Sequence, residues 1–171
     1  MKKINISITF PLALYICICI NSSVTLADDL ASSNLDSYGI KSENEAKKDF
    51  ERYCKDSATK RGILDNAMYN NCYEYESSGY FELIYTLKNN QYPWLSKLLP
   101  KIIKSWTKRG VTQWRMVNFD VETEIDAYLD VKYMKEHQES SIQKINSCYY
   151  IYKEDENVWN MTRHCIQNQH F

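Results

Sequence analysis

The sequence predicts an all-α protein built from three tandem helical hairpins, about six helices in total, with one disulfide inside each of two hairpins and a signal peptide in front. The 171 residues include only 4 glycines and 3 prolines, too few turn residues for a fold of many short strands. Part of the chain also repeats itself, and four cysteines occupy matching positions in the first and last repeats.

Residues 1–27 have the three-part form of a secretory signal. Lys2 and Lys3 precede an apolar run that ends at Ile20, and a polar stretch then leads to Ala27. The apolar run is shorter than the roughly 20 residues that a membrane-spanning helix needs. We therefore expect cleavage after Ala27 and a mature protein that is secreted or periplasmic, without membrane insertion once the signal is removed.

Residues 28–44 are rich in Ser, Asp, Asn and Glu and have no apolar period, so a flexible N-terminal arm is expected there. The remaining residues, 45–171, are short enough for a single domain. We assign them to one helical-repeat domain with units at about 45–90, 91–137 and 138–171.

The repeat is seen when residues 54–87 are laid over 102–135 without a gap, because 11 of the 34 positions are then identical. A period of this length is typical of stacked supersecondary units. A shorter third copy follows, in which Trp159-Asn160-Met161 matches Trp114-Arg115-Met116. The 11 identical pairs are Ser57/Ser105, Thr59/Thr107, Lys60/Lys108, Arg61/Arg109, Gly62/Gly110, Met68/Met116, Asn70/Asn118, Glu74/Glu122, Glu76/Glu124, Tyr80/Tyr128 and Tyr85/Tyr133.

The first unit begins with a capping box, Ser42 with Glu45, ahead of an apolar helical stripe. Lys60-Arg61-Gly62 is expected to end that helix, with the glycine in the left-handed cap position; a basic patch for an anionic partner is the alternative. The second helix of the unit places one apolar face at intervals of three and four residues, through Met68, Cys72, Tyr75, Gly79 and Leu83.

The middle unit repeats this plan with an apolar helix that runs from Leu95 to Trp106. The helix expected after it, at about 112–136, is apolar on two faces and therefore needs neighbours on both sides. The last unit is expected to have a first helix that contains Ile145 and Cys148 and an antiparallel second helix that contains Val158 and Cys165.

The cysteines of the mature chain predict two local disulfides. Cys54 and Cys72 lie at matching ends of the two helices of the first hairpin, and Cys148 and Cys165 do the same in the third. Four cysteines allow three pairings, but the recurrence of the same two positions favours Cys54 with Cys72 and Cys148 with Cys165. Export to an oxidising compartment favours bridging.

Several classes of site are disfavoured. The chain has 21 basic and 22 acidic residues, and this balance provides no basic field for nucleic acid. Cys148, His164, Cys165 and His170 do not have the ligand spacing of a zinc site, so neither metal nor cofactor is expected. We find no catalytic motif and assign no catalytic residue.

Two pairs of acids provide the material for an alternative, a secreted hydrolase of cell-wall or other extracellular polymer. Glycosidases use two carboxylates across a cleft, and Glu74 with Glu76, or Glu122 with Glu124, could be offered for that role. Residues two apart on a helix point to different sides. Solvated surface is therefore the favoured interpretation of both pairs.

Tyrosine is the most distinctive part of the composition, with 14 in the chain. Tyrosine rings are common at binding surfaces because they offer contact area at low entropic cost. We predict an exported, non-catalytic protein-binding module, for example an inhibitor or immunity-type protein acting in the periplasm or outside the cell, with an unidentified protein partner. Its expected binding surface comprises Tyr69, Tyr73, Tyr80, Tyr149 and Tyr150.

Overall fold

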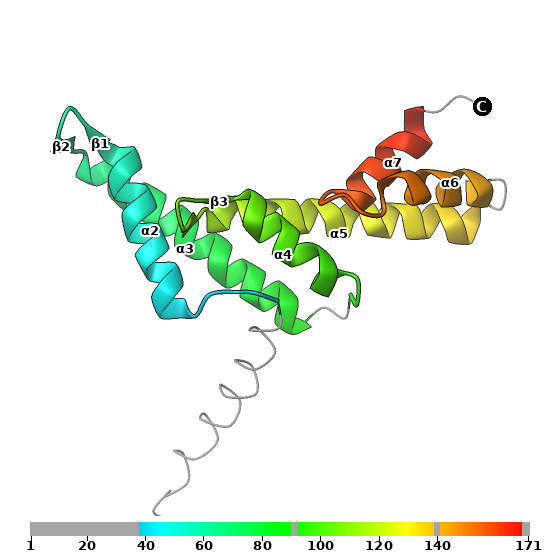
Figure 1. Ribbon diagram of the computed structural model, residues 1–171, viewed down its shortest axis with the longest axis horizontal. Coiled ribbons are helices and arrows are strands. Elements are labelled where there is room, and N and C mark those ends of the chain that lie inside the picture. Colours follow the sequence, from blue (N-terminus) through cyan, green and yellow to red (C-terminus); the bar gives the residue numbers. More distant parts are fainter. Residues whose placement is uncertain (1–37, 90–91, 139–140, 169–171) are drawn as a thin grey trace, which may run out of the picture.

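The computed structural model describes residues 38–89, 92–138 and 141–168. Their six helices pack in pairs and confirm the predicted fold class. The three units follow one another along the long axis of the molecule (Figure 1). The predicted signal peptide and residues 28–37 of the predicted arm lie outside the described residues. The helices are α2 (Glu43–Ala58) and α3 (Asn66–Asn89), α4 (Leu95–Ser105) and α5 (Trp114–His137), α6 (Ile142–Tyr152) and α7 (Val158–Asn168).

The end of the predicted arm, residues 38–44, is part of the folded structure. Helix α2 already begins at Glu43, behind the predicted capping box, in which the Ser42 N–H donates to Glu45 Oε2 at 3.1 Å. Ile40 is buried in the core. The sequence did not indicate this packing, because one apolar residue in a polar segment does not produce a helical or strand periodicity.

The Thr-Lys-Arg-Gly segments form β-hairpins instead of the expected helix caps. Strand β1 (Thr59–Lys60) pairs with β2 (Ile63–Leu64), and β3 (Thr107–Lys108) pairs with β4 (Val111–Thr112). The two residues of each turn have positive φ, 52° and 80° at Arg61 and Gly62 and 54° and 78° at Arg109 and Gly110. A two-residue hairpin turn of type I′ requires positive φ at both positions. The glycine is therefore left-handed, as predicted, but in a turn beyond the helix.

Both predicted disulfides are present, Cys54 with Cys72 and Cys148 with Cys165. The first joins α2 to α3 and the second joins α6 to α7. In the middle unit a hydrogen bond occupies the corresponding region, where Trp106 Nε1 donates to Asp120 Oδ2 at 2.6 Å. This bond ties the end of α4 to α5 without a covalent link.

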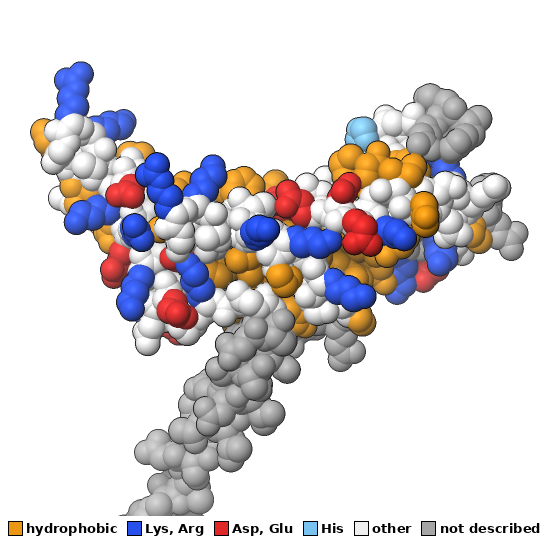
Figure 2. All heavy atoms as spheres, viewed as in Figure 1, with side chains coloured by type: hydrophobic (Ala, Val, Ile, Leu, Met, Phe, Trp, Pro, Cys, Tyr) orange, Lys and Arg blue, Asp and Glu red, His pale blue; other side chains and the backbone are white. Residues whose placement is uncertain are grey.

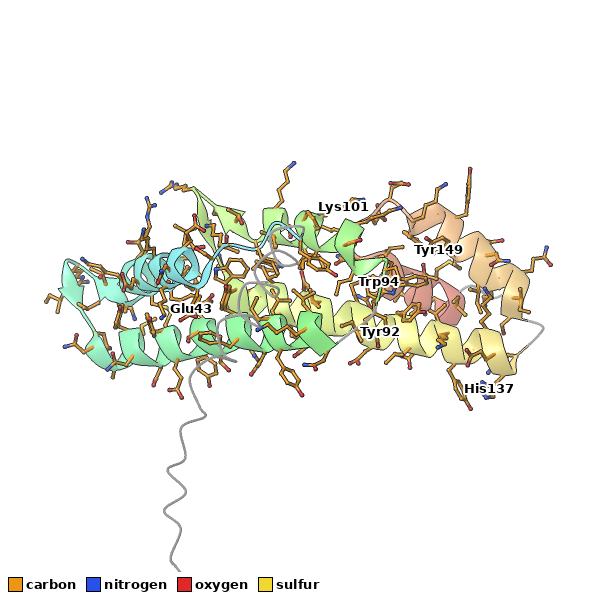
Figure 3. The ribbon with its side chains drawn as sticks, turned by 90° about the horizontal axis from the view of Figure 1, so that it is seen from below. Glu43, Tyr92, Trp94, Lys101, His137 and Tyr149 are labelled. Carbon is orange, nitrogen blue, oxygen red and sulfur yellow. A yellow bond between two sulfur atoms is a disulfide. The ribbon has the colours of Figure 1, made fainter. Side chains whose placement is uncertain are left out.

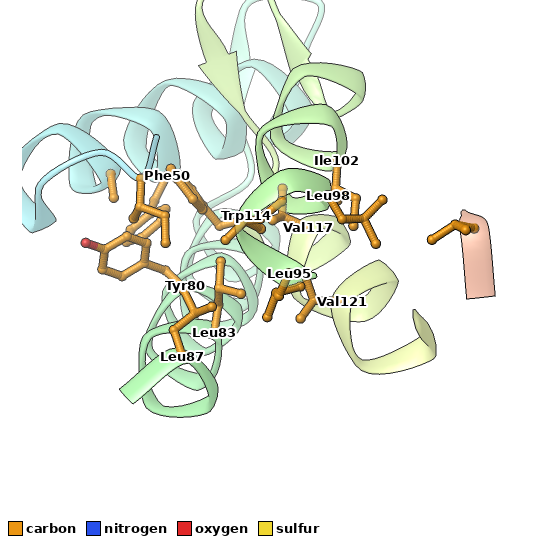
Figure 4. Packing of buried hydrophobic residues seen from close by; sticks show 14 residues of the cluster. Phe50, Tyr80, Leu83, Leu87, Leu95, Leu98, Ile102, Trp114, Val117 and Val121 are labelled. Atoms are coloured by element: carbon orange, nitrogen blue, oxygen red, sulfur yellow. The ribbon is translucent and has the colours of Figure 1, made fainter. Parts of the chain in front are cut away.

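The second helices of the units, α3, α5 and α7, pack on one another in sequence. Helix α5 contacts α3 along its first half and α7 further on, and this confirms that it needs neighbours on two sides. The main core lies where α2, α3, α4 and α5 meet, around the fully buried ring of Trp114 and the ring of Phe50 (Figure 4). A smaller core in the third unit surrounds Cys148 and Cys165.

Candidate binding groove between the second and third units

The junctions between units position the candidate site, and they are built alike. Helix α5 begins against the middle of α3, beside Glu76 and Gly79, and α7 begins against the middle of α5, beside Glu124. At the first junction the ring of Tyr80 meets Trp114 edge to face at 5.1 Å. At the second, the equivalent rings of Tyr128 and Trp159 lie 4.9 Å apart.

Glu76 and Glu124 are buried at these junctions, and the expectation of solvated surface is wrong for both. Glu124 is 1% exposed. Its two carboxylate oxygens accept the N–H groups of Trp159 at 2.7 Å and Asn160 at 3.2 Å. Glu76 accepts the N–H of Arg115 at 3.3 Å. The first N–H groups of a helix have no partner within the helix, so the glutamate of one unit caps the second helix of the next.

The burial of these carboxyl groups changes their acidity. Burial raises the pKa of Glu124 to about 7, against the lowering effect of the two backbone N–H groups. Burial likewise raises the pKa of Glu76. A buried carboxylate at a helix start is favoured by the N–H groups and the helix dipole but loses its hydration. Here the lost hydration is the larger effect.

Gly79 allows α3 and α5 to approach closely. A Cβ atom at this position would lie 2.5 Å from the Cα of Arg115, a distance that only a shift of one helix could relieve. The equivalent position in α5 is Ala127, which is fully buried. Both α3 and α5 therefore carry a glutamate and, three residues later, a small residue where the next unit begins.

The candidate site is a groove at the second junction, between α4 and the connection from α6 to α7, residues 153–157. It has an open part of about 720 Å³ and a smaller cavity of about 80 Å³, and both are lined by Lys101 and Asp155. Basic and acidic side chains are mixed over the middle of the face shown in Figure 2, where α4 meets this connection. The smaller cavity is lined by Trp94, Lys97, Leu98, Lys101, Tyr149, Lys153, Asp155, Val158 and Trp159.

Aromatic rings from four helices and their flanks form the floor of the groove. The rings of Tyr149 and Trp159 stack at 5.1 Å, and those of Trp94 and Trp159 lie 5.8 Å apart. Tyr92 and Tyr128 extend the cluster on the other side of Trp94. Trp94, Tyr92 and Tyr149 converge where α4, α5 and α6 meet (Figure 3). The indole Nε1 atoms of Trp94 and Trp159 are buried without an acceptor among the described residues.

Lysines dominate the rim of the smaller cavity. Lys97, Lys101 and Lys153 line it beside one acid, Asp155. Lys101 reaches across the groove, where its Nζ donates to the backbone carbonyl of Glu154 at 2.8 Å. Lys153 Nζ lies 4.4 Å from the centre of the Tyr150 ring. Aromatic rings and three lysines that line one cavity suit an occupant that is apolar in part and negatively charged at its edge.

The five tyrosines predicted as a binding surface do not form one surface. Tyr80 is 4% exposed, and its hydroxyl donates to the backbone carbonyl of Lys41 at 2.9 Å, so it belongs to the core. Tyr69 and Tyr73 are half-buried on α3, where Tyr73 packs edge to face on Phe50. Tyr149 and Tyr150 are exposed on α6, and only Tyr149 lines the smaller cavity.

Sequence reasoning did not identify Trp94 and Trp159, the other two rings of the cavity. They are 65 positions apart in the chain, and no local pattern joins them. One signal was available for Trp159, because it matches Trp114 in the third copy of the repeat. Neither Glu76 nor Glu124 lines the groove, and their engagement with backbone N–H groups gives both a structural role.

No protein-family model, curated protein or solved structure matches this chain. Its fold defines the class to which it belongs, an all-α protein of three tandem helical hairpins with two disulfides. The two disulfides suggest an oxidising, extracytoplasmic setting. Among the described residues no helix is both long and apolar enough to cross a membrane.

Proposed function

We propose that this protein is an exported, non-catalytic binding module that holds a segment of a partner protein in the groove between α4 and the α6–α7 connection. The observation that supports it is the cavity that the rings of Trp94, Tyr149 and Trp159 line together with three lysines. Aromatic residues are enriched at protein interfaces. Helical arrays commonly present such surfaces to other proteins.

The chemistry of the groove defines the segment that it would bind. The rings and Leu98 offer an apolar contact for one aromatic or large aliphatic side chain. Lys97 and Lys153 on the rim attract carboxylates on either side of that anchor. The expected ligand is an acidic segment with one apolar anchor.

An inhibitor or immunity-type protein is one concrete form of this function. Such a protein needs a binding surface that keeps its shape outside the cytoplasm. The Cys148–Cys165 disulfide joins the two helices of the hairpin that forms one wall of the groove. Glu124 caps the start of α7 through the N–H of Trp159 and so fixes the position of that residue. This protein would inhibit a partner in the same compartment by binding an acidic segment of that partner in the groove.

A displayed peptide library tests the proposal. The oxidised protein is used to select random peptides, and each selected peptide is measured against two charge-reversed variants. Lys97→Glu with Lys153→Glu alters the rim of the groove. Lys55→Glu with Lys88→Glu changes the net charge equally at two exposed positions that do not line the groove.

We expect selection to enrich peptides in which an aromatic or large aliphatic residue is flanked by Asp or Glu. They should bind the wild type and the Lys55/Lys88 variant equally and the Lys97/Lys153 variant about tenfold more weakly or worse, since complementary charge contributes to both specificity and affinity. Selection of no consensus would contradict the proposal. So would equal binding to both charge-reversed variants.

A further inference from the structure

The two ends of the helical array carry the two halves of one inter-unit contact, and we infer that a second copy of this chain binds there head to tail. This contact goes beyond the proposed function, because it uses the first β-hairpin and the outer face of α6 and leaves the groove free. Side chains that a neighbouring unit covers in the middle of the array are exposed at the equivalent positions of the two end units.

The first β-hairpin exposes apolar side chains whose equivalents in the second unit are covered. Ile63 is 75% exposed, Leu64 38% and Met68 41%. In the second unit, Thr112 at the position of Leu64 is fully buried, and Val111 and Met116 are half-buried. Helix α2 covers Val111 and Thr112, because it packs on β4, which these two residues form. At the same contact Lys41 Nζ donates to the Gly110 carbonyl at 2.9 Å.

Helix α6 exposes the opposite half of the same contact at the other end. Aligning Cys148 with Ile102 places Gln143, Ser147, Tyr150 and Ile151 at the positions of Lys97, Lys101, Lys104 and Ser105. On α4 those four side chains face the third unit across the groove. On α6 they line a shallow hollow together with Ile142 and Asn146. Tyr150 is 72% exposed and Ile151 59%.

Terminal units of helical arrays need polar outer faces to prevent association, and each end of the described array exposes large apolar side chains among its polar ones. A second copy resolves both exposures at once, since its α6 would cover the first hairpin as α2 covers the second. At the junctions inside the array, a glutamate of one unit caps the start of the second helix of the next. The start of α3 is already capped within its own unit, because Asp65 Oδ1 accepts the Met68 N–H at 3.0 Å. The second copy therefore does not need to supply a carboxylate there. Two different patches meeting head to tail leave a free patch at each end of a dimer, so the association continues beyond two chains, into a ring where the rotation closes and into a filament where it does not.

Sedimentation velocity of the oxidised, exported protein over a range of concentrations tests this inference. Ile63→Glu blocks the hairpin end and Ile151→Glu blocks the α6 end, each at a position more than half exposed, so that folding is not at risk. Phe119→Glu is the control, since Phe119 is 55% exposed on α5 and belongs to neither end. Circular dichroism and disulfide mapping verify that each variant is folded.

The wild type and Phe119→Glu should associate reversibly as concentration rises, without a limit at two chains. Each end variant alone should remain monomeric. An equimolar mixture of the two should form a species of two chains and stop there, because each variant supplies the end that the other lacks. A wild type that is monomeric throughout would overturn the inference. An end variant that still dimerises alone, or a mixture that stays monomeric, would also overturn it, because the two patches then do not bind each other.

Discussion

Glu124→Gln tests the buried glutamate cap through the pH dependence of stability. The side chain is 1% exposed, and burial raises its pKa from the ordinary 4.5 to about 7. An acid whose pKa is raised by folding binds its proton more tightly in the folded protein than in the unfolded chain. Its contribution to stability is therefore complete below pH 4.5 and is lost as the pH rises through about 7.

The size of the effect follows from the shift. At roughly 1.4 kcal/mol per pKa unit, ionisation of Glu124 should lower the free energy of unfolding by about 3 kcal/mol between pH 4.5 and a pH above 7. Glutamine at this position has no proton to lose. The free energy of unfolding of the wild type should therefore fall relative to that of the variant by about this amount as the pH rises.

Urea unfolding of both proteins at a series of pH values measures this difference directly. Other groups titrate in the same range, but they are common to both proteins and cancel in the comparison. Glu122→Gln is the matched control, because it removes the same charge from an exposed position two residues away. A wild type and a Glu124→Gln variant whose stabilities run parallel with pH would refute the reasoning.

Three further predictions concern the fold. Gly79→Ala should destabilise the protein by about 1–3 kcal/mol through overpacking against Arg115, although alanine is the better helix former by about 1 kcal/mol; thermal unfolding that showed a gain, as expected for the exposed control Asn71→Ala, would contradict the close approach. Arg109→Asn should raise stability by about 0.5–1 kcal/mol, because asparagine tolerates the positive φ of the turn better than arginine; a loss in the same melting experiment would mean that the Arg109 side chain makes a stabilising contact. Peptide mapping of the unreduced protein by mass spectrometry should find Cys54 joined to Cys72 and Cys148 to Cys165, and crossed pairs would exclude this arrangement of hairpins.

The features that could be predicted from the sequence are those that a local pattern of residues reveals, either within one helix or by its recurrence in another unit. Helical periodicity indicated the helix pairs, and the recurrence of two cysteine positions selected one of three disulfide pairings. The repeat also indicated three units. None of these inferences needs to know how one unit lies on the next.

The buried glutamates show where local pattern fails. Glu76 lies four residues after Cys72 and three before Gly79, and so on the apolar stripe of its own helix. That position, together with the identity of Glu76 and Glu124, could have indicated burial. The partner that makes burial tolerable is the start of the next second helix, 39 positions further along the chain at Arg115, and a local pattern does not reveal it.

The hairpins were missed for a different physical reason. Four residues in two short strands are too few to show an alternation of period two. Arginine at the first turn position also disguises a turn in which asparagine or glycine is preferred. The groove could not be predicted because its rings come from separate segments of the second and third units, and only Tyr149 among the expected surface residues lies in it.

The four tryptophans allow the most direct test of the central claim, that the groove binds a partner segment. Trp94 and Trp159 line the groove, whereas Trp106 and Trp114 do not line it and donate their indole N–H groups to Asp120 and Asp49. The ¹⁵N-labelled protein is titrated with a selected acidic peptide, and the four indole N–H signals are followed by NMR. We expect the Trp94 and Trp159 signals to move and those of Trp106 and Trp114 to stay in place. Binding that leaves the first two unmoved, or moves all four alike, would contradict it.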